Sequence, residues 1–157
     1  MTVREKIENN EKIMLSEKAC PSADTKGRII QEEKCPLRTD FQRDRDRIIH
    51  SNSFRRLKHK TQVFFNIDND HICTRMEHVQ HVDSVSNTIS KKLGLNEELT
   101  KAIAIAHDLG HAPFGHQGET VIKELTQKYL GKNFWHEQNG VYFVDKVELL
   151  EDNQKNL

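Results

Sequence analysis

Cysteine, proline and aromatic residues are scarce in this sequence, which has three cysteines, three prolines and 6% aromatic residues. The cysteine count is odd and no Cys-X-X-Cys pair occurs, so neither a disulfide framework nor a cysteine-based zinc site is indicated. No apolar run approaches the length that spans a membrane, and the first residues lack the apolar core of a secretory signal. We therefore expect a cytoplasmic protein with no membrane partner.

An excess of charge of one sign is also absent. Lys and Arg together number 24, as do Asp and Glu, so the formal net charge is zero. That balance argues against binding of nucleic acid through total charge, although a local basic patch is compatible with it. The 157 residues suffice for one domain with a hydrophobic core.

Two regions differ in character. Residues 1–37 are charged and weakly periodic, and Pro21 and Pro36 interrupt them. We interpret these residues as a mobile leader with room for one short helix. Residues 38–157 are the predicted domain.

The densest polar cluster runs from His107 to Glu119 and contains three histidines, one aspartate and one glutamate. The preceding residues 99–106 are apolar and rich in helix formers, so the cluster begins where a buried helix ends. Imidazole and carboxylate groups are both ligands that divalent metal sites accept. A single His-Asp pair is more often a polar helix cap, but five ionisable groups with three glycines between them favour a metal site.

A long helix is predicted before this cluster. Thr74 and Glu77 have the spacing of a capping box, and Gly94 is a suitable C-terminal residue. Apolar residues recur every three or four positions between these ends, which predicts one buried helix face. The members of that face are Met76, Val79, Val82, Val85, Ile89 and Leu93.

The next predicted helix runs from Asn96, a good N-cap, to Asp108. Because the link between the two helices is short, we expect them to pack antiparallel. That arrangement brings His107 and Asp108 beside His78, in the first turns of the long helix. Taken alone, His78 would be a hydrogen-bonded histidine at the edge of the core, but its convergence with the His-Asp pair predicts a metal site.

A third helix is predicted from about Gln117 to Gly131, with a last helix after it. His116 and Glu119 lie within reach of each other at the start of the third helix, and a carboxylate beside an imidazole suits a general acid or base. The alternative is a glutamate that complements the helix dipole, which explains Glu119 but not His116. The apolar residues expected to face inward from the last helix are Val141, Val144 and Val147.

One stretch is basic, since residues 38–65 hold eight Lys or Arg residues against three Asp. On a helix, Arg43 and Arg47 share a face one turn apart. Two guanidinium groups could form an anion site, most suitably for phosphates. A solvated helix whose acids offset its arginines is an equally good interpretation. A short extended segment is expected near residues 60–73.

Five blocks carry a recognisable order of motifs, at residues 43–51, 54–57, 60–64, 75–78 and 107–119. The last block has the spacing HD…GH…GHxGE. In this order the blocks resemble the deoxyguanosine triphosphate triphosphohydrolase family of HD-domain phosphohydrolases, and residues 134–138 resemble a further family block. The resemblance covers residues 38 to about 142, two thirds of the chain.

The resemblance implies an all-α HD-domain helical bundle that hydrolyses a deoxynucleoside triphosphate, with dGTP favoured, to deoxynucleoside and triphosphate. It implies one divalent metal ion, Mn, Mg or Fe in preference to Zn, bound by His78, His107 and Asp108. His116, with Glu119 behind it, would be the catalytic pair. The residues implied at the substrate are Gln62, Arg75, His111 and His136.

The resemblance also implies a role for the basic residues in a second, regulatory nucleotide site or in subunit contacts of a homo-oligomer. These residues are Arg43, Arg47, Arg55, Arg56 and Lys60. The family completes its metal site with a further aspartate well downstream, and no residue here fits it. We therefore expect the N-terminal part of a longer enzyme, a bundle incomplete at its C-terminus, weakened metal binding and impaired turnover.

Other interpretations are compatible with parts of the sequence. An HD-type phosphodiesterase or nucleotidase would share the metal residues but would not need the block from Arg43 to Phe64. A non-catalytic nucleotide or single-stranded nucleic-acid binder would alternate aromatic with basic residues, and only Phe41 and Phe54 do so. A truncated, non-functional remnant is the third alternative.

Overall fold

The computed structural model describes residues 1–28, 30–60, 69 and 71–148. Within these residues the regular structure is helical and contains no β-strand, which confirms the all-α expectation. The predicted extended segment near 60–73, with Gln62 in it, falls mainly outside the described residues. The elements are α1 (Val3–Met14), η1 (Ser22–Asp24), α2 (Asp40–His50), α3 (Asn52–Arg56), η2 (Leu57–His59), α4 (Arg75–Leu93), α5 (Glu97–Ala106), α6 (Gly115–Leu130), α7 (His136–Tyr142) and the π-helical turn η3 (Phe143–Val147).

The long helix and the one after it begin where their capping residues predict. The Thr74 hydroxyl accepts the Glu77 N–H and the Glu77 carboxylate accepts the Thr74 N–H, so a capping box begins α4. Gly94 ends α4 with a φ of 65°, a left-handed conformation that favours glycine. Asn96 caps α5 by accepting the Leu99 N–H.

The end of α5 differs from the prediction, because the helix stops at Ala106 rather than at Asp108. Two turns follow it. The Leu109 N–H donates to the Ala106 carbonyl, and the His111 N–H donates to the Asp108 carbonyl. These turns use hydrogen bonds between residues three apart, so the polar cluster starts in a tight loop and not in the last turn of the helix.

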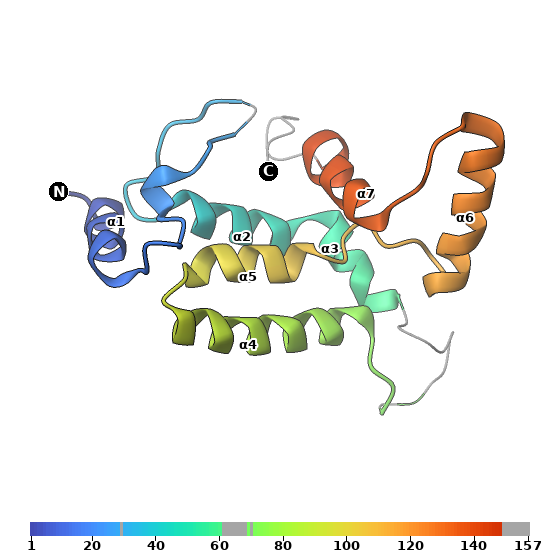
Figure 1. The fold of residues 1–157 in the computed structure, drawn as a ribbon, viewed down its shortest axis with the longest axis horizontal. Helices are drawn as coiled ribbons and strands as arrows, with labels where there is room; N and C mark the ends of the chain where they lie inside the picture. The colour runs from blue at the N-terminus through green and yellow to red at the C-terminus, as the bar shows by residue number, and fades with distance from the viewer. Residues whose placement is uncertain (29, 61–68, 70, 149–157) are drawn as a thin grey trace.

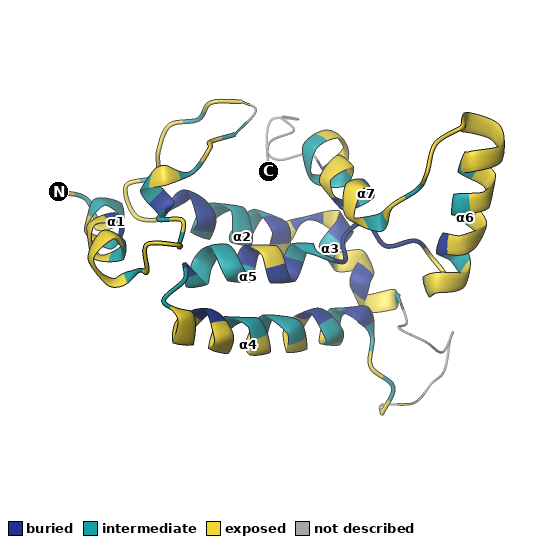
Figure 2. Ribbon diagram, viewed as in Figure 1, coloured by how far each residue is buried: buried dark blue, intermediate teal, exposed yellow. Residues whose placement is uncertain are grey.

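Three helices form a layer in which α5 lies between α2 and α4 (Figure 1). α4 and α5 run antiparallel, as the short link between them predicts. Figure 2 shows the buried residues of the three helices on the sides that face one another. The buried residues of this core are Ile48, Leu57, Val79, Ala102, Ile105 and Leu109.

Only part of the predicted buried face of α4 is buried. Val79 lies in the core, whereas Val85, Ile89 and Leu93 are exposed. Over the second half of the helix the contact with α5 is polar instead, because Ser90 is buried and its hydroxyl accepts a hydrogen bond from the Thr100 hydroxyl at 2.9 Å. The apolar period therefore continues past Val79 onto a surface that α5 does not cover.

The last two helices also leave apolar side chains exposed. α6 begins two residues earlier than predicted, at Gly115, and stands apart from the three-helix layer (Figure 1). The expectation that three valines of the last helix face inward is wrong for two of them, since Val141 and Val147 are exposed. Val144 alone of the three packs against the core, because the π-helical turn changes the period on which the prediction rested.

The leader contains the short helix for which it had room, α1, and this segment contacts the helical layer. The Ser16 N–H donates to the Gly94 carbonyl at 2.8 Å, and the Asn96 side-chain amide donates to the Cys20 carbonyl at 3.1 Å. The division of the chain at residue 37 stays a prediction. Among the described residues, no helix combines the length and the apolar character needed to cross a bilayer.

Candidate active site

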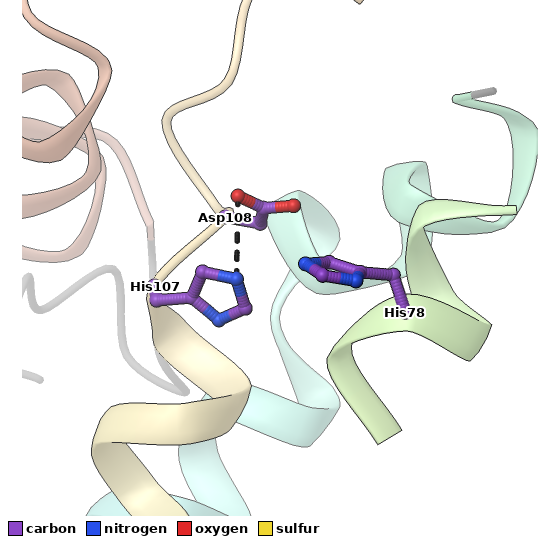
Figure 3. Close-up of side chains that lie close together, drawn as sticks. All are labelled: His78, His107 and Asp108. Atoms are coloured by element: carbon purple, nitrogen blue, oxygen red, sulfur yellow. Dashed lines mark ion pairs between the residues drawn. The ribbon is translucent and has the colours of Figure 1, made fainter. Parts of the chain in front are cut away.

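Three side chains converge between the start of α4 and the end of α5. His78 lies in the first turns of α4, and His107 with Asp108 directly follows α5. One ligand atom from each lies within 4.8 Å of the other two, and Figure 3 shows the two rings and the carboxylate facing a common space. The predicted convergence is therefore confirmed, while the role of these residues as metal ligands stays a prediction.

The ring of His107 is held in one tautomer. Its Nδ1 lies 2.6 Å from the Ala104 carbonyl oxygen, and since a carbonyl can only accept, Nδ1 carries the hydrogen. The other nitrogen, Nε2, is then the unprotonated one in the neutral ring, and it faces the Asp108 carboxylate at 3.4 Å. A hydrogen bond that fixes one ring nitrogen and leaves the other for a cation is typical of metal-binding histidines.

Asp108 is buried and ionised. Burial raises the pKa of its carboxyl group, but the Arg75 hydrogen bond and the His107 and Arg75 charges outweigh burial, so the pKa is below its usual value. The Arg75 guanidinium donates to Asp108 Oδ2 at 2.8 Å, and both side chains are about 5% exposed. Asp108 Oδ1 is the oxygen that faces His107. One oxygen is thus engaged by an arginine and the other faces His107.

The donor set fits a divalent metal ion. Two imidazoles and one carboxylate form a mixed nitrogen and oxygen set, which Mn, Fe and Zn sites accept. Neighbouring ligands about 2.1 Å from one ion are roughly 3–3.5 Å apart, so side chains grouped within 4.8 Å would have to move closer together around a bound ion. These three residues could therefore hold an ion at the junction of α4 and α5.

A second cluster of ionisable side chains lies next to the first, and it centres on Glu119. This buried carboxylate contacts His136 Nδ1 and Lys123 Nζ, each at 3.1 Å, and lies 3.9 Å from His116 Nδ1. The predicted partner, His116, is thus near Glu119 but farther than His136, and its side chain is 83% exposed. Burial raises the pKa of Glu119, but the hydrogen bonds from His136 and Lys123 outweigh it, so the carboxyl pKa is below its usual value.

His111 connects the two clusters. Its ring stacks on the His136 ring with the centroids 4.7 Å apart, and the His116 ring meets it edge-on at 5.6 Å. The side chain is buried, and burial followed by the Arg75 charge lowers the pKa of His111 to about 4. His111 is therefore neutral at pH 7, and its buried Nδ1 has no hydrogen-bond partner among the described residues.

Lys60 lies at this site, although the resemblance had grouped it with the regulatory or interface residues. Its ammonium group donates to the His111 carbonyl at 2.7 Å. Burial, followed by the Arg75 and Arg56 charges, lowers the pKa of Lys60, and Asp108 opposes that shift. Lys60 and Arg75 thus place two cationic side chains beside the candidate metal residues.

The other basic residues have partners of their own or are exposed. Arg43 and Arg47 share one face of α2, as their spacing predicts, and each donates to Glu32 Oε2 at 2.6 Å. Arg55 and Arg56 are exposed on α3. The basic stretch is therefore not one continuous patch, because its members face different parts of the molecule.

Two residues of the site were missed by sequence reasoning. Lys123 contacts Glu119 and places its ammonium 5.2 Å from the centre of the Trp135 ring. Asn139 donates from its side-chain amide to the Gly110 carbonyl at 2.8 Å. Lys123 could have been found from its i, i+4 spacing to Glu119, whereas the contact of Asn139 depends on how α7 packs and has no local signal.

Known proteins are similar to this chain over most of its length. The family model described as HD domain matches residues 75–156. Proteins named deoxyguanosinetriphosphate triphosphohydrolase-like are 54% identical in Desulfatibacillum aliphaticivorans, 51% in Caldanaerobacter subterraneus and 48% in Clostridium tetani, each over 94% of this chain and 41–42% of the relative. The chain thus spans about two fifths of the length of these curated relatives. It belongs to the HD-domain family, and the relatives that it matches carry the name of dGTP triphosphohydrolase-like proteins.

Proposed function

We propose that the chain carries the metal- and phosphate-binding part of a cytoplasmic hydrolase that converts a deoxynucleoside triphosphate, dGTP first, to deoxynucleoside and triphosphate. One observation carries the proposal: the group of His78, His107 and Asp108 adjoins a second group of three histidines and Glu119. The names of the relatives support the substrate class.

The reaction adds the oxygen of water to the α-phosphorus and breaks its bond to the 5′-oxygen. One water proton ends on that 5′-oxygen. A divalent ion held by His78, His107 and Asp108 would supply Lewis-acid polarisation of the phosphate and a lower pKa of bound water. Arg75 and Lys60 offset the negative charge of the triphosphate, and they act in a partly desolvated site where such charges count for more than in water.

His116 is the proposed proton-transfer residue. Its exposed ring is free to meet a substrate, and Glu119 lies behind it at 3.9 Å. Glu119 also binds His136 and Lys123, so this carboxylate is held in place before the substrate arrives. We expect His116→Ala in the full-length protein to abolish hydrolysis while nucleotide binding persists, with the exposed His50→Ala as the control. Retained hydrolysis would remove His116 from the mechanism.

Product analysis tests the reaction class. The full-length protein is incubated with dGTP and Mn²⁺, and the products are separated by anion-exchange chromatography. Deoxyguanosine with intact triphosphate supports the proposal. A monophosphate or inorganic phosphate would instead favour the HD-type phosphodiesterase or nucleotidase.

The single-stranded nucleic-acid alternative is weakened by burial. Phe41 is buried in α2 and Phe54 packs against the core. These two rings are therefore not available as stacking surfaces for bases. Binding of nucleotide without any product would be the result that favours a non-catalytic binder.

We further propose that the metal is held weakly by this chain, because three protein ligands converge where the family uses four. The measurement is metal content after dialysis of the purified chain loaded with Mn²⁺. A stoichiometric, tightly held ion would refute the incompleteness of the site.

A second, regulatory nucleotide site stays a proposal with one supporting observation. Arg43 and Arg47 meet at a single carboxylate oxygen of Glu32, so the two guanidinium groups are spaced to hold one anion. A phosphate group would compete with Glu32 for them. Glu32→Gln should then strengthen the binding of a second dNTP, measured with the dNTP in excess. Assembly into a homo-oligomer is the remaining proposal.

A further inference from the structure

Two consecutive carbonyl groups, those of Gly110 and His111, lie in the loop between α5 and α6, called here the site loop. Each accepts a hydrogen bond from a side chain far away in the sequence. The Asn139 amide donates to the Gly110 carbonyl at 2.8 Å, and the Lys60 ammonium donates to the His111 carbonyl at 2.7 Å. Asn139 comes from α7 and Lys60 from the residue after η2. The two residues that hydrogen-bond to the site loop, Lys60 and Asn139, are therefore 79 residues apart in the sequence.

On the Asn139 side, the backbone of α7 packs closely against the site loop. A Cβ atom on Gly110 would lie 2.1 Å from the Gly140 nitrogen and 2.2 Å from the His136 carbonyl oxygen. Such distances show that the first turns of α7 rest directly on the loop, with room for glycine alone. The same helix presents the His136 ring, which stacks on His111.

On the other side, Lys60 connects the site loop to the start of α4. The Lys60 carbonyl accepts the Arg75 N–H at 2.9 Å, while the Lys60 ammonium reaches His111. Arg75 in turn binds Asp108. One lysine therefore ties the backbone of His111 to the helix that carries the candidate metal residue His78.

We propose that Lys60 and Asn139 are positioning residues that clamp the carbonyls of His111 and Gly110 and so fix the His111 ring between the two ionisable clusters. The proposal rests on the proposed function in taking His111 as a residue that faces the phosphates. It goes beyond that function because it gives a positioning role to Asn139, for which the sequence predicted no role. It gives the same role to Lys60, which the resemblance placed at a regulatory site or subunit contact.

The test compares Lys60→Met and Asn139→Ala with matched controls. Lys58→Met changes an exposed lysine two residues before Lys60, and Gln138→Ala changes an exposed amide next to Asn139. Hydrogen exchange of residues 107–114 is measured by mass spectrometry, because two turn hydrogen bonds protect amides there. Each clamp variant should exchange about tenfold faster in this stretch, as the loss of one charge-assisted or partly buried hydrogen bond predicts, and each control should match the unchanged chain.

Two further readouts separate positioning from general stability. The ring resonances of His111 should move in both clamp variants, while those of the exposed His50 stay in place. Lys60→Arg keeps a cationic donor and should restore most of the protection. Neither readout requires turnover, so a failure of the clamp and a failure of the proposed hydrolysis can be told apart.

Unchanged exchange in both clamp variants would overturn the proposal, as would equal acceleration in the controls. If Lys60→Met does not fold, Asn139→Ala decides alone, and full protection of the loop in that variant would end the proposal.

Discussion

Replacing Gly110 with alanine is a sharp perturbation of the site, because the structure fixes what the added methyl group meets. It would lie 2.1 Å from the Gly140 nitrogen and 2.2 Å from the His136 carbonyl oxygen. Atoms in van der Waals contact are about 3.5 Å apart, so the loop and α7 must separate by more than about 1 Å. That movement breaks the 2.8 Å hydrogen bond from Asn139 to Gly110.

Two effects add up to the expected loss of stability. Overpacking of a close contact costs roughly 1–3 kcal/mol, and the lost hydrogen bond costs about 1 kcal/mol. We therefore expect Gly110→Ala to lower the free energy of unfolding by roughly 2–4 kcal/mol. The measurement is urea unfolding followed by far-ultraviolet circular dichroism.

Gly140→Ala is the matched control on the facing side of the contact. Its Cβ would lie 3.4 Å from the Gly110 nitrogen, which is close to an ordinary contact. Alanine also favours the interior of α7 by about 1 kcal/mol over glycine. The control should therefore be unchanged or slightly more stable. A Gly110→Ala protein as stable as the unchanged chain would refute the close packing of α7 on the loop.

Three other variants give separate tests. Asp108→Asn should weaken Mn²⁺ affinity by at least about tenfold in calorimetric titration, and an unchanged affinity would remove Asp108 from the ligand set. Because burial lowers the pKa of His111 to about 4, the unfolded chain takes up a proton at a higher pH than the folded chain. Stability should therefore fall by roughly 3 kcal/mol as the pH drops from about 6.5 to 4, and His111→Gln should flatten this dependence in pH-dependent unfolding. Glu148 is buried and accepts hydrogen bonds from the Asn52 and Ser53 N–H groups. Glu148→Ala should therefore lower the free energy of unfolding in urea by about 2–4 kcal/mol. A decrease under about 0.5 kcal/mol would contradict a stabilising role of these hydrogen bonds.

The parts of the fold that sequence could predict are those with local causes. The ends of α4 follow from Thr74, Glu77 and Gly94, because capping boxes and left-handed glycines act within a few residues. Which face of a helix is buried depends on the elements that pack against it, so this was harder to predict. The apolar face of α4 continues to Leu93, yet α5 covers the polar side at Ser90.

The same distinction holds for the candidate site. The convergence of His78 with His107 and Asp108 follows from a short link between two antiparallel helices, so sequence spacing was enough. Glu119 was expected beside His116, one helical turn away, but its closer histidine is His136, which lies on another helix. A contact between residues far apart in sequence has no periodic signal to reveal it.

The pairing of Arg75 with Asp108 links the two halves of the site. Asp108 has one oxygen on Arg75 and one toward His107, so the arginine keeps this carboxylate ionised and oriented before any cation or phosphate arrives. A group that is already oriented loses little freedom on binding. Because Arg75 is buried with its charge largely matched by Asp108, a cation that takes over the carboxylate would leave that guanidinium charge available to an anion. If a metal ion and a phosphate both bind here, each should therefore strengthen the binding of the other through this ion pair.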